Sequence, residues 1–449
     1  MEDKDVSQDF ARIAKGAGIV FLGMLASKVL TYAWRLVVAR FGPEAYGLVS
    51  LGIALLTIAT TLCMLGFANG VERFVAYHYG KKDSKKLANT LRLGLGVCLL
   101  TTVAVAVVGF VFAGTLADTV FGKPELAVIL QILALALPAS AFIEIYAAAF
   151  RGIQRVGEIV LARNFLDSFF KIALALVPMA LGAGLAGLAA GYVAALYLTF
   201  LSLAVLMRRH VQLGKPTWDA ELAAYSLPLL ALSIITTSMP YIDTIVLGIY
   251  RSATEVGVYN AAFPAAQLLL IAPTAIFSLF LSVITANFAQ KNEKAVGTLY
   301  RRVSKWVFLA NVPVLAFLVL FPEKTLYHFF GPEYAVAAGA LAVLAAGNFV
   351  FSFFWSSLFI HNMMKRTREL VYFPAVALLM NVVLNVILIP LYGIDGAAVA
   401  TTTALFVYGG LFFWNTHRLL NVFPLDKKSV AAAIVAGVLF SAYHLAAQF

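Results

Sequence analysis

The chain is built from long apolar stretches separated by short polar segments. About 18 or more apolar residues in a row are enough for a helix to cross the hydrocarbon core of a bilayer. Strands of a membrane barrel would instead show segments of about 10 residues with alternating polarity. The pattern therefore predicts an all-α integral membrane protein with about thirteen transmembrane helices, over residues 13–39, 46–77, 87–114, 127–150, 157–181, 187–207, 222–249, 256–286, 304–322, 335–360, 370–392, 396–416 and 429–446.

Three short stretches recur in the same order at separations of 208 to 210 residues, which indicates an internal duplication. The repeat unit holds six predicted helices, so both copies insert with the same orientation. Parallel repeats of this kind build transporters that hold substrate at the repeat interface. The stretches pair as FGKPELAV (121–128) with FGPEYAV (330–336), GLAGLAAGYVAA (184–195) with GIDGAAVATTTA (393–404), and AYGLVSLG (45–52) with EVGVYNAA (255–262).

The duplication predicts four parts. They are an N-terminal six-helix lobe at 1–208, a cytoplasmic linker at 209–217, a C-terminal six-helix lobe at 218–418, and a basic loop with one appended helix at 419–449.

Composition and charge support a membrane protein and argue against nucleic-acid binding. The chain is 62% hydrophobic and 12% charged, which leaves too little polar surface for a soluble protein of 449 residues. The net charge is +11, but the basic residues concentrate in alternate loops. That asymmetry follows the positive-inside rule and places the N-terminus in the cytoplasm. We therefore expect a multi-pass protein of the cell (plasma or inner) membrane.

Cationic side chains inside the predicted spans all fall in the first half of the chain. Each such group costs about 2.5–3.5 kcal/mol at a helix centre, so it normally faces a cavity or a partner. Lys28 and Arg35 are two helical turns apart on one face, with Tyr32 between them. A positive chamber suits a phosphate-bearing anion. The candidate binding residues of this half are Lys28, Tyr32, Arg35, Asn69, Arg73, Asn164 and Lys171.

Each cation also has a purely structural interpretation. Lys171 follows Asp167 by four residues, so the two can form an ion pair within one helix. Glu72 can neutralise its neighbour Arg73. Arg35 lies near the predicted outer surface of the membrane and Arg73 near the cytoplasmic surface, where long side chains extend to the interface.

The second half offers one acid and several amides. Asp243, without an acidic or basic neighbour on its own helix, is the candidate for an H+ or Na+ coupling site. Asn260 and Gln267 can donate hydrogen bonds to sugar hydroxyls. For Asn381 and Asn385 an interhelical hydrogen bond is the preferred interpretation.

Motifs for metal binding, nucleotide hydrolysis and enzymatic chemistry are missing from the sequence. The two cysteines lie in predicted spans, the six histidines are scattered, and no HExxH or Walker A motif occurs. The one D-x-D, Asp3–Asp5, stands in the polar segment before the first predicted span. We expect no catalytic residues, no metal and no cofactor other than a coupling ion.

Five stretches resemble the polysaccharide-type flippases of the multidrug/oligosaccharidyl-lipid/polysaccharide exporter superfamily, the group that contains O-antigen flippases. The resemblance covers about residues 1–418. It rests on ARFGPEAYGLVSL (39–51), VERFVAYHYGKKD (71–83), FRGIQRVGE (150–158), DTIVLGIYRSATEVGVYNAA (243–262) and LNVILIPLYGIDGAAVAT (384–401).

The resemblance implies two six-helix lobes that form a V around a cavity open alternately to each side. It implies a flippase that moves polyprenyl- or dolichyl-pyrophosphate-linked oligosaccharide from the cytoplasmic to the outer leaflet, with no enzymatic activity. By the same match, Arg73 and Lys171 stand where relatives often carry a basic residue, and Asp243 opens the D-x-x-x-L-G stretch. Relatives often have fourteen spans, against thirteen predicted here.

Competing functions are a flippase for the peptidoglycan precursor lipid II, a cation-coupled multidrug exporter, and a membrane glycosyltransferase. A drug exporter prefers acidic pockets, and a transferase needs paired carboxylates near a loop. The expected partners are the lipid-linked oligosaccharide, membrane lipids and, transiently, glycan synthesis or polymerisation machinery, with no nucleic acid.

Overall fold

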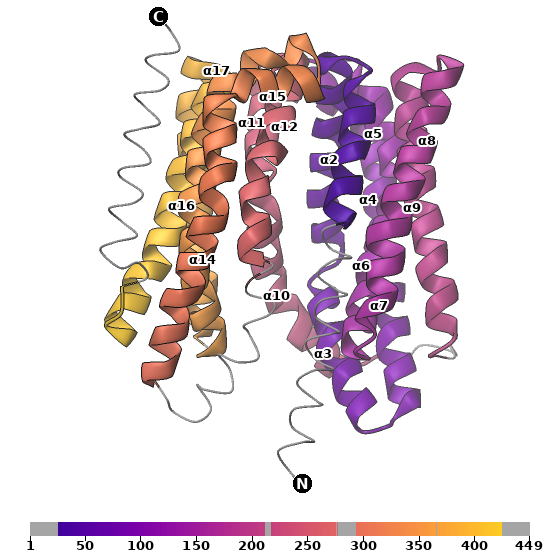
Figure 1. Ribbon diagram of the computed structural model, residues 1–449. Helices are drawn as coiled ribbons and strands as arrows, with labels where there is room; N and C mark the ends of the chain where they lie inside the picture. Colours follow the sequence, from indigo (N-terminus) through magenta and orange to yellow (C-terminus); the bar gives the residue numbers. More distant parts are fainter. Residues whose placement is uncertain (1–25, 212–216, 275, 277–292, 365, 424–449) are drawn as a thin grey trace, which may run out of the picture. The chain divides into compact units, whose positions relative to one another are not determined.

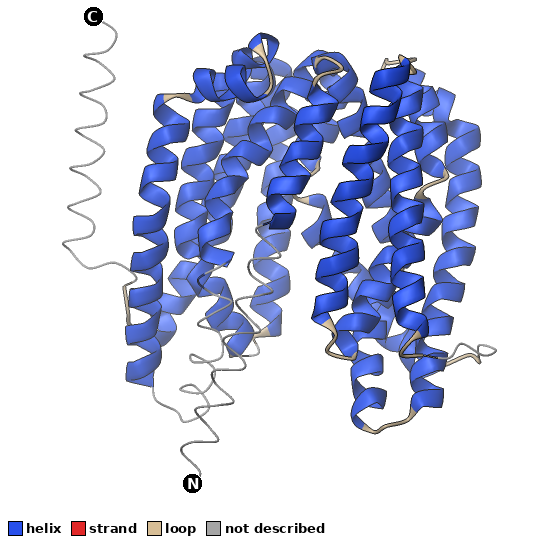
Figure 2. Ribbon diagram, turned by 45° about the vertical axis from the view of Figure 1, so that its right-hand side comes forward, coloured by secondary structure: helices blue, strands red, loops and turns tan. Residues whose placement is uncertain are grey.

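Helices make up almost all of the described chain, as Figure 2 shows in blue. The structure is a computed structural model, and it describes residues 26–211, 217–274, 276, 293–364 and 366–423. Nine helices in these residues are long and apolar enough to cross a membrane, or ten if one bent pair is counted as a span. Part of the first predicted span and all of the last, at 429–446, lie outside the described residues. The all-helical membrane fold is confirmed.

Two compact units divide the chain between Gly257 and Val258. The first contains two helices, α10 (Ala220–Ser238) and α11 (Ile242–Tyr250), that the duplication assigns to the C-terminal lobe. Asn89 provides one physical reason for this. Its amide donates to the Thr217 carbonyl at 2.9 Å and accepts from the Thr217 backbone N–H at 2.7 Å, which fixes the chain entering α10 to α4.

The first unit begins with a helix over residues 26–39. Its other elements follow in chain order (Figure 1): α2 (Pro43–Cys63), α3 (Phe67–Gly80), α4 (Ser84–Thr115), η1 (Leu116–Val120), α5 (Leu126–Ala134), α6 (Leu137–Gly152), α7 (Val156–Ile159), η2 (Val160–Leu166), α8 (Asp167–Leu181), α9 (Gly184–Arg208), α10, α11 and the first turn of α12 (Ala253–Ala266).

Several predicted spans are broken helices. Residues 46–77 were predicted as one helix, and this was wrong: α2 ends at Cys63 and α3 begins at Phe67, with left-handed backbone at Leu65 and Gly66 between them. The span predicted at 127–150 is the bent pair α5 and α6, which meet at 49°. Pro138, near the start of α6, lacks the N–H that would continue α5.

The second unit holds the rest of α12 and the long helices that follow it. In Figure 1 the colours of α14, α16 and α17 run from orange to yellow, and α16 packs against both α14 and α17. The elements are η3 (Gln267–Leu270), α14 (Glu293–Leu320), α15 (Pro322–Phe329), η4 (Pro332–Ala337), α16 (Ala338–Met363) and α17 (Thr367–Leu420). The spans predicted at 370–392 and 396–416 are the two arms of α17.

The repeated sequence stretches adopt the same backbone geometry in both units. Gly184 begins α9 with φ +60°, and its counterpart Gly393 separates the arms of α17 with φ +57°. Three residues later, a Cβ at Gly187 would come 2.8 Å from Pro178, and a Cβ at Gly396 would come 2.3 Å from the Leu388 carbonyl oxygen. Both copies of G-x-x-G therefore turn one helix tightly against the next, which supports the duplication.

A third repeat pair meets inside the first unit. A Cβ at Gly47 would lie 1.8 Å from the Ala253 carbonyl oxygen, and one at Gly257 would lie 1.8 Å from the Pro43 carbonyl oxygen. The backbones of α2 and the first turn of α12 therefore touch, as small residues allow in membrane bundles.

Candidate functional site

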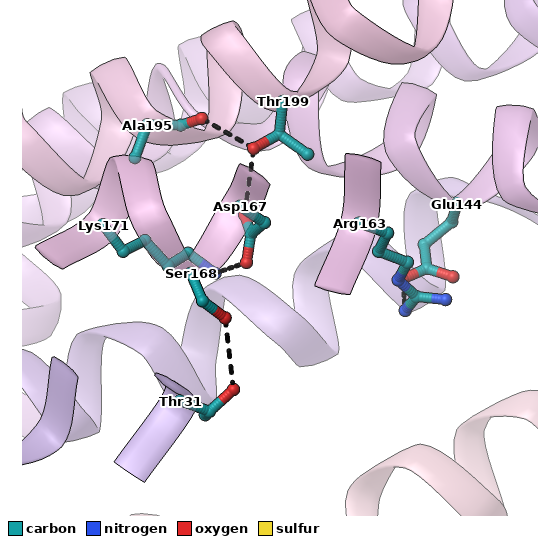
Figure 3. A network of polar contacts seen from close by, with 8 residues as sticks. All are labelled: Thr31, Glu144, Arg163, Asp167, Ser168, Lys171, Ala195 and Thr199. Atoms are coloured by element: carbon teal, nitrogen blue, oxygen red, sulfur yellow. Dashed lines mark hydrogen bonds and ion pairs between the residues drawn. The ribbon is translucent and has the colours of Figure 1, made fainter. Parts of the chain in front are cut away.

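An ion pair on α8 anchors a polar cluster in the first unit. Lys171 Nζ lies 2.7 Å from Asp167 Oδ2, and the two side chains are only 17% and 15% exposed to solvent. The hydroxyl of Thr199 on α9 donates to Asp167 Oδ1 at 3.1 Å (Figure 3). Both carboxylate oxygens are thus occupied, so Asp167 holds Lys171 in place.

Irregular backbone immediately precedes this pair. Residues Val160–Leu166 form a π-helical turn before α8 starts at Asp167. Such turns insert one extra residue, redirect the side chains that follow, and occur frequently at functional sites. Asn164 lies in this turn and is half-buried, and Arg163 forms an ion pair with Glu144 of α6.

The N-terminal helix joins the cluster through a hydroxyl and a ring. Thr31 Oγ1 lies 3.4 Å from Ser168 Oγ of α8, as Figure 3 shows. The ring of Trp34 lies 5.6 Å from that of Tyr192 on α9, centroid to centroid. The same Tyr192 ring lies 4.8 Å from Lys171 Nζ, a cation–π contact. Helix 26–39, α8 and α9 therefore present one continuous set of polar and aromatic side chains.

Arg35 is the cation of this cluster that has phenol partners in place of a carboxylate. Its Nη1 donates to Tyr46 Oη of α2 at 3.1 Å. Tyr32, Tyr46 and Tyr241 are close enough to interact with it electrostatically. In the described residues no acidic side chain forms an ion pair with Arg35. Neutral phenols accept hydrogen bonds from a guanidinium but do not cancel its charge.

Lys28 adds a second uncompensated charge. It lies two turns before Arg35 on the same face, its side chain is exposed, and the two cations repel each other. Among the residues that the structure describes, no carboxylate pairs with Lys28. Because Lys171 is neutralised by Asp167, the surplus positive charge of the cluster belongs to Lys28 and Arg35.

Asn69 and Arg73 lie on a different face, where α3 packs against α10. Arg73 places its guanidinium carbon 4.1 Å from the centre of the Tyr225 ring, and Asn69 donates to Ser233 Oγ at 3.0 Å. Neither side chain makes a described hydrogen bond or ring contact with the Arg35 cluster. The structure therefore divides the predicted cations of the first half into two groups.

The interpretation that Glu72 neutralises Arg73 was wrong. Glu72 Oε2 instead accepts from Arg151 Nε of α6 at 2.7 Å. Glu72 and Arg73 contact different helices because the side chains of successive residues point about 100° apart around a helix axis. Arg73 remains exposed, and no ion pair to it occurs in the described part of the chain.

The remaining predicted residues lie elsewhere. Asp243 on α11 is almost completely buried, with 1% exposure, in the first unit. Asn260 is buried and Gln267 is half-buried, and both belong to the second unit. Asn381 donates to Thr401 Oγ1 at 3.0 Å, which joins the two arms of α17 and confirms its interhelical role.

Several uncharged residues of the cluster were not predicted, among them Tyr46, Tyr192 and Thr199, because the predictions rest on charges, amides and one tyrosine. Tyr46 and Tyr192 nevertheless carry a signal. They lie in two of the repeated stretches, and their counterparts in the second copy are Val256 and Thr401. Thr199 gives no comparable signal. Within the described residues no group of three or more His, Cys, Asp or Glu side chains is arranged to hold a metal ion.

Comparison with known proteins places the chain in a family. Residues 13–290 match the family described as "Polysaccharide biosynthesis protein", and residues 228–387 match the MatE family. A "Probable flippase AglR" of Haloferax volcanii is 28% identical over 215 residues, which are 45% of this chain and 44% of that protein. "Lipid II flippase MurJ" of Bacillus subtilis is 20% identical over 96% of this chain and 87% of its own length.

The matched stretch spans less than half the length of the first curated relatives, at 39%, 43% and 44%. The fold extends further. A solved structure described as the inward-facing conformation of a multidrug resistance MATE family transporter of the MOP superfamily aligns over 90% of this chain and 98% of its own. Its TM-score is 0.76 at 18% identity. The chain belongs to the polysaccharide biosynthesis protein family and is a multi-pass membrane protein with the transporter fold of the MOP superfamily.

Proposed function

We propose that the chain is a flippase that moves a pyrophosphate-linked oligosaccharide lipid from the cytoplasmic to the outer leaflet by alternating access. The observation that carries the proposal is the surplus charge at Lys28 and Arg35. A charged group within a span is costly unless it has a partner or a ligand. Tyrosine partners leave the Arg35 charge available, and the planar guanidinium suits a phosphate oxygen.

The aromatic neighbours fit the other half of such a cargo. Tyr32 is half-buried beside Arg35, Tyr192 is half-buried beside Lys171, and phenol hydroxyls both donate and accept hydrogen bonds. Sugar hydroxyls need partners of that kind. That Asn164 binds the cargo remains a prediction. The same holds for Asn69, Arg73, Asn260 and Gln267.

The test is a flipping assay in sealed vesicles that contain the full chain and a fluorescent polyprenyl-pyrophosphate oligosaccharide. Lys28→Gln with Arg35→Gln removes the surplus charge. The double variant Lys82→Gln with Lys85→Gln is the matched control, because it removes two exposed cations beside the start of α4. Loss of charge-assisted hydrogen bonds at about 1.5–3 kcal/mol each predicts that the first pair slows flipping by about tenfold or more.

Flipping that is undiminished in the Lys28/Arg35 variant would refute the assignment of the site. Failure of the unmodified protein to move the oligosaccharide lipid would refute the function.

Lipid II is the second candidate cargo, and the match to Bacillus subtilis MurJ over 96% of the chain favours it. Both cargoes carry a pyrophosphate, so the same cations serve either one. Fluorescent lipid II in the same vesicles separates them, because the preferred headgroup is the one that competes better at equal concentration. Movement of a lipophilic cation in place of both would select the drug exporter.

We also propose that flipping is coupled to an ion, H+ or Na+, with Asp243 as the predicted site, and that the N-terminus is cytoplasmic. Imposed pH and sodium gradients across the same vesicles test the first point, and Asp243→Asn should abolish the response to the relevant gradient. A protease-cleavable N-terminal tag in cells tests the second.

A further inference from the structure

We propose that His361, together with Asn415 and the Ser357 carbonyl, forms a proton-binding site in the second unit, and that its occupancy is coupled to transport. The coupling rests on the flippase function proposed above. The binding of a proton does not, and it can be measured separately.

His361 lies in the last turn of α16 and has no exposed surface. Its Nδ1 is 2.8 Å from the Ser357 carbonyl oxygen, and its Nε2 is 3.1 Å from Oδ1 of Asn415 on α17. The hydroxyl of Thr416 lies 3.5 Å from Nδ1. Both ring nitrogens therefore have polar partners inside an apolar bundle.

The two partners differ in what they allow. A carbonyl oxygen only accepts, so Nδ1 carries a hydrogen in the tautomer that satisfies it. The Asn415 amide has an acceptor on one side and a donor on the other, and a half-turn exchanges them. When the Asn415 side-chain oxygen faces the ring, it accepts a hydrogen bond from Nε2–H of an imidazolium. When the Asn415 side-chain nitrogen faces the ring, it donates a hydrogen bond to Nε2 of a neutral imidazole. His361 can thus gain or lose a proton at Nε2 without leaving a buried polar atom unsatisfied.

Charges around the site come from both helices packed on α16. Glu369, in the first turn of α17, interacts electrostatically with His361 and is held by Arg366 at 2.8 Å. Its carboxylate stabilises an imidazolium, and Arg366 opposes it. From α14, Tyr300 contributes a neutral hydroxyl 2.9 Å from Ser357 Oγ. The other described ionisable side chains of this part of α14 and of the ends of α17 are exposed, namely Arg301, Arg302, Lys305, Arg368, His417 and Arg418.

The position of His361 gives its charge a structural effect. Its ring contacts Phe373 in the first arm of α17 and Phe412 in the second, at centroid distances of 6.3 and 5.0 Å. Gly393 separates those arms. A proton at Nε2 therefore changes the contacts of α16 with both arms at once, as expected of an ion site that biases a conformational change.

Histidine NMR on the full chain in lipid nanodiscs tests the binding. Histidine labelled with 15N and 13C gives one signal set per residue, and His361→Gln identifies the set of interest. As the pH of the sample is lowered from about 8 to about 5, we expect imidazolium signals of His361 to appear, with Nδ1 protonated throughout. The matched control is His417→Gln, which removes an exposed histidine of α17 and should leave the His361 titration unchanged.

The flipping assay, repeated across that pH range, tests the coupling. The rate of the unmodified protein and of His417→Gln should change with pH, and the rate of His361→Gln, which keeps Asp243, should change less. If His361→Gln fails to fold, Asn415→Leu keeps the imidazole but removes its Nε2 partner, and the fraction of imidazolium in the His361 signals at a given pH should then differ from that of the unmodified protein.

A His361 signal that stays neutral down to pH 5 would overturn the proton site. Titration of His361 together with coincident pH–rate profiles for His361→Gln and the unmodified protein would overturn the coupling. Absence of flipping in every protein refutes the flippase function, and the NMR titration still decides the proton site.

Discussion

Asp167 and Lys171 provide the sharpest energetic test of the cluster, because each is the charge partner of the other. At 2.7 Å, Coulomb's law with an effective dielectric constant of about 20 gives an attraction of about 6 kcal/mol. Removal of both ions from water offsets most of that attraction. The net contribution of the pair to the free energy of unfolding is therefore small, whereas removal of one partner lowers that free energy strongly.

Three variants separate these contributions. Asp167→Asn leaves the Lys171 ammonium without a carboxylate, and breaking a buried pair costs about 3–5 kcal/mol. Because 15–17% of each side chain is still exposed, we expect the lower end, about 3 kcal/mol. Lys171→Met should cost a similar amount. The double variant buries no unpaired charge and should lose only about 1 kcal/mol, so the coupling free energy should be about 5 kcal/mol.

Equilibrium unfolding in mixed detergent micelles measures the four free energies. Thr199→Val is a graded control, because it removes one neutral donor from Asp167 and should cost about 1 kcal/mol. If the double variant loses as much stability as the two single variants together, the ion pair is not coupled and the reasoning fails. Full flipping activity in a stable double variant would show in addition that Lys171 is not needed to bind the cargo. Lys171 would then have the purely structural role that its i,i+4 spacing from Asp167 allows.

Three further predictions concern a strained glycine, a side chain that fixes the entry to α10, and a buried lysine. Gly393→Ala forces a side chain into φ +57° and should destabilise the protein by about 1–3 kcal/mol, whereas Gly410→Ala, where a Cβ meets nothing within 4 Å, should be neutral in the same unfolding measurement. Asn89→Ala removes the hydrogen bonds to Thr217, so hydrogen exchange near Thr217 should become faster, and unchanged exchange would contradict the clamp. Burial lowers the pKa of Lys123 in the loop before α5 below its usual 10.5, so the unfolded chain binds more protons just below pH 10.5. The unmodified protein should therefore gain stability relative to Lys123→Met as the pH rises toward 10.5, and parallel pH–stability curves would refute this.

Much of the fold follows from hydrophobic run length, because a bilayer accepts a helix of about 20 apolar residues and little else. What run length does not reveal is where a helix breaks. The residues directly before and after the break are apolar, yet Leu65 and Gly66 adopt left-handed backbone. The break depends on a neighbour, since a Cβ at Gly66 would lie 2.1 Å from the Ser226 carbonyl oxygen of α10. That contact spans about 160 residues and leaves no local trace.

The candidate site was partly predictable for a related reason. Lys28, Arg35 and Lys171 stand out because charge in a span is rare and expensive. Whether such a charge is compensated depends on tertiary contacts. Spacing indicated Asp167 as the partner of Lys171, and this was confirmed at 2.7 Å. Glu72, the neighbour of Arg73 along the chain, was a possible partner for it, but Glu72 pairs instead with Arg151 of α6.

Duplication and charge together explain why the cluster formed in one unit only. Both copies retain the glycines that shape the turns, because those positions tolerate no side chain. Tyr46 lies next to Gly47, whose counterpart is Gly257, and Tyr192 lies in the stretch that begins at Gly184, whose counterpart is Gly393. At these two positions the second copy has Val256 and Thr401. Tyr46 binds Arg35, and Tyr192 covers Lys171. We therefore expect the phenols to stabilise Arg35 on helix 26–39 and Lys171 on α8. Replacement of Tyr46 by valine, as in the second copy, should therefore destabilise the protein while Arg35 is present and much less in the Arg35→Met background, and equal losses in the two backgrounds would contradict this dependence.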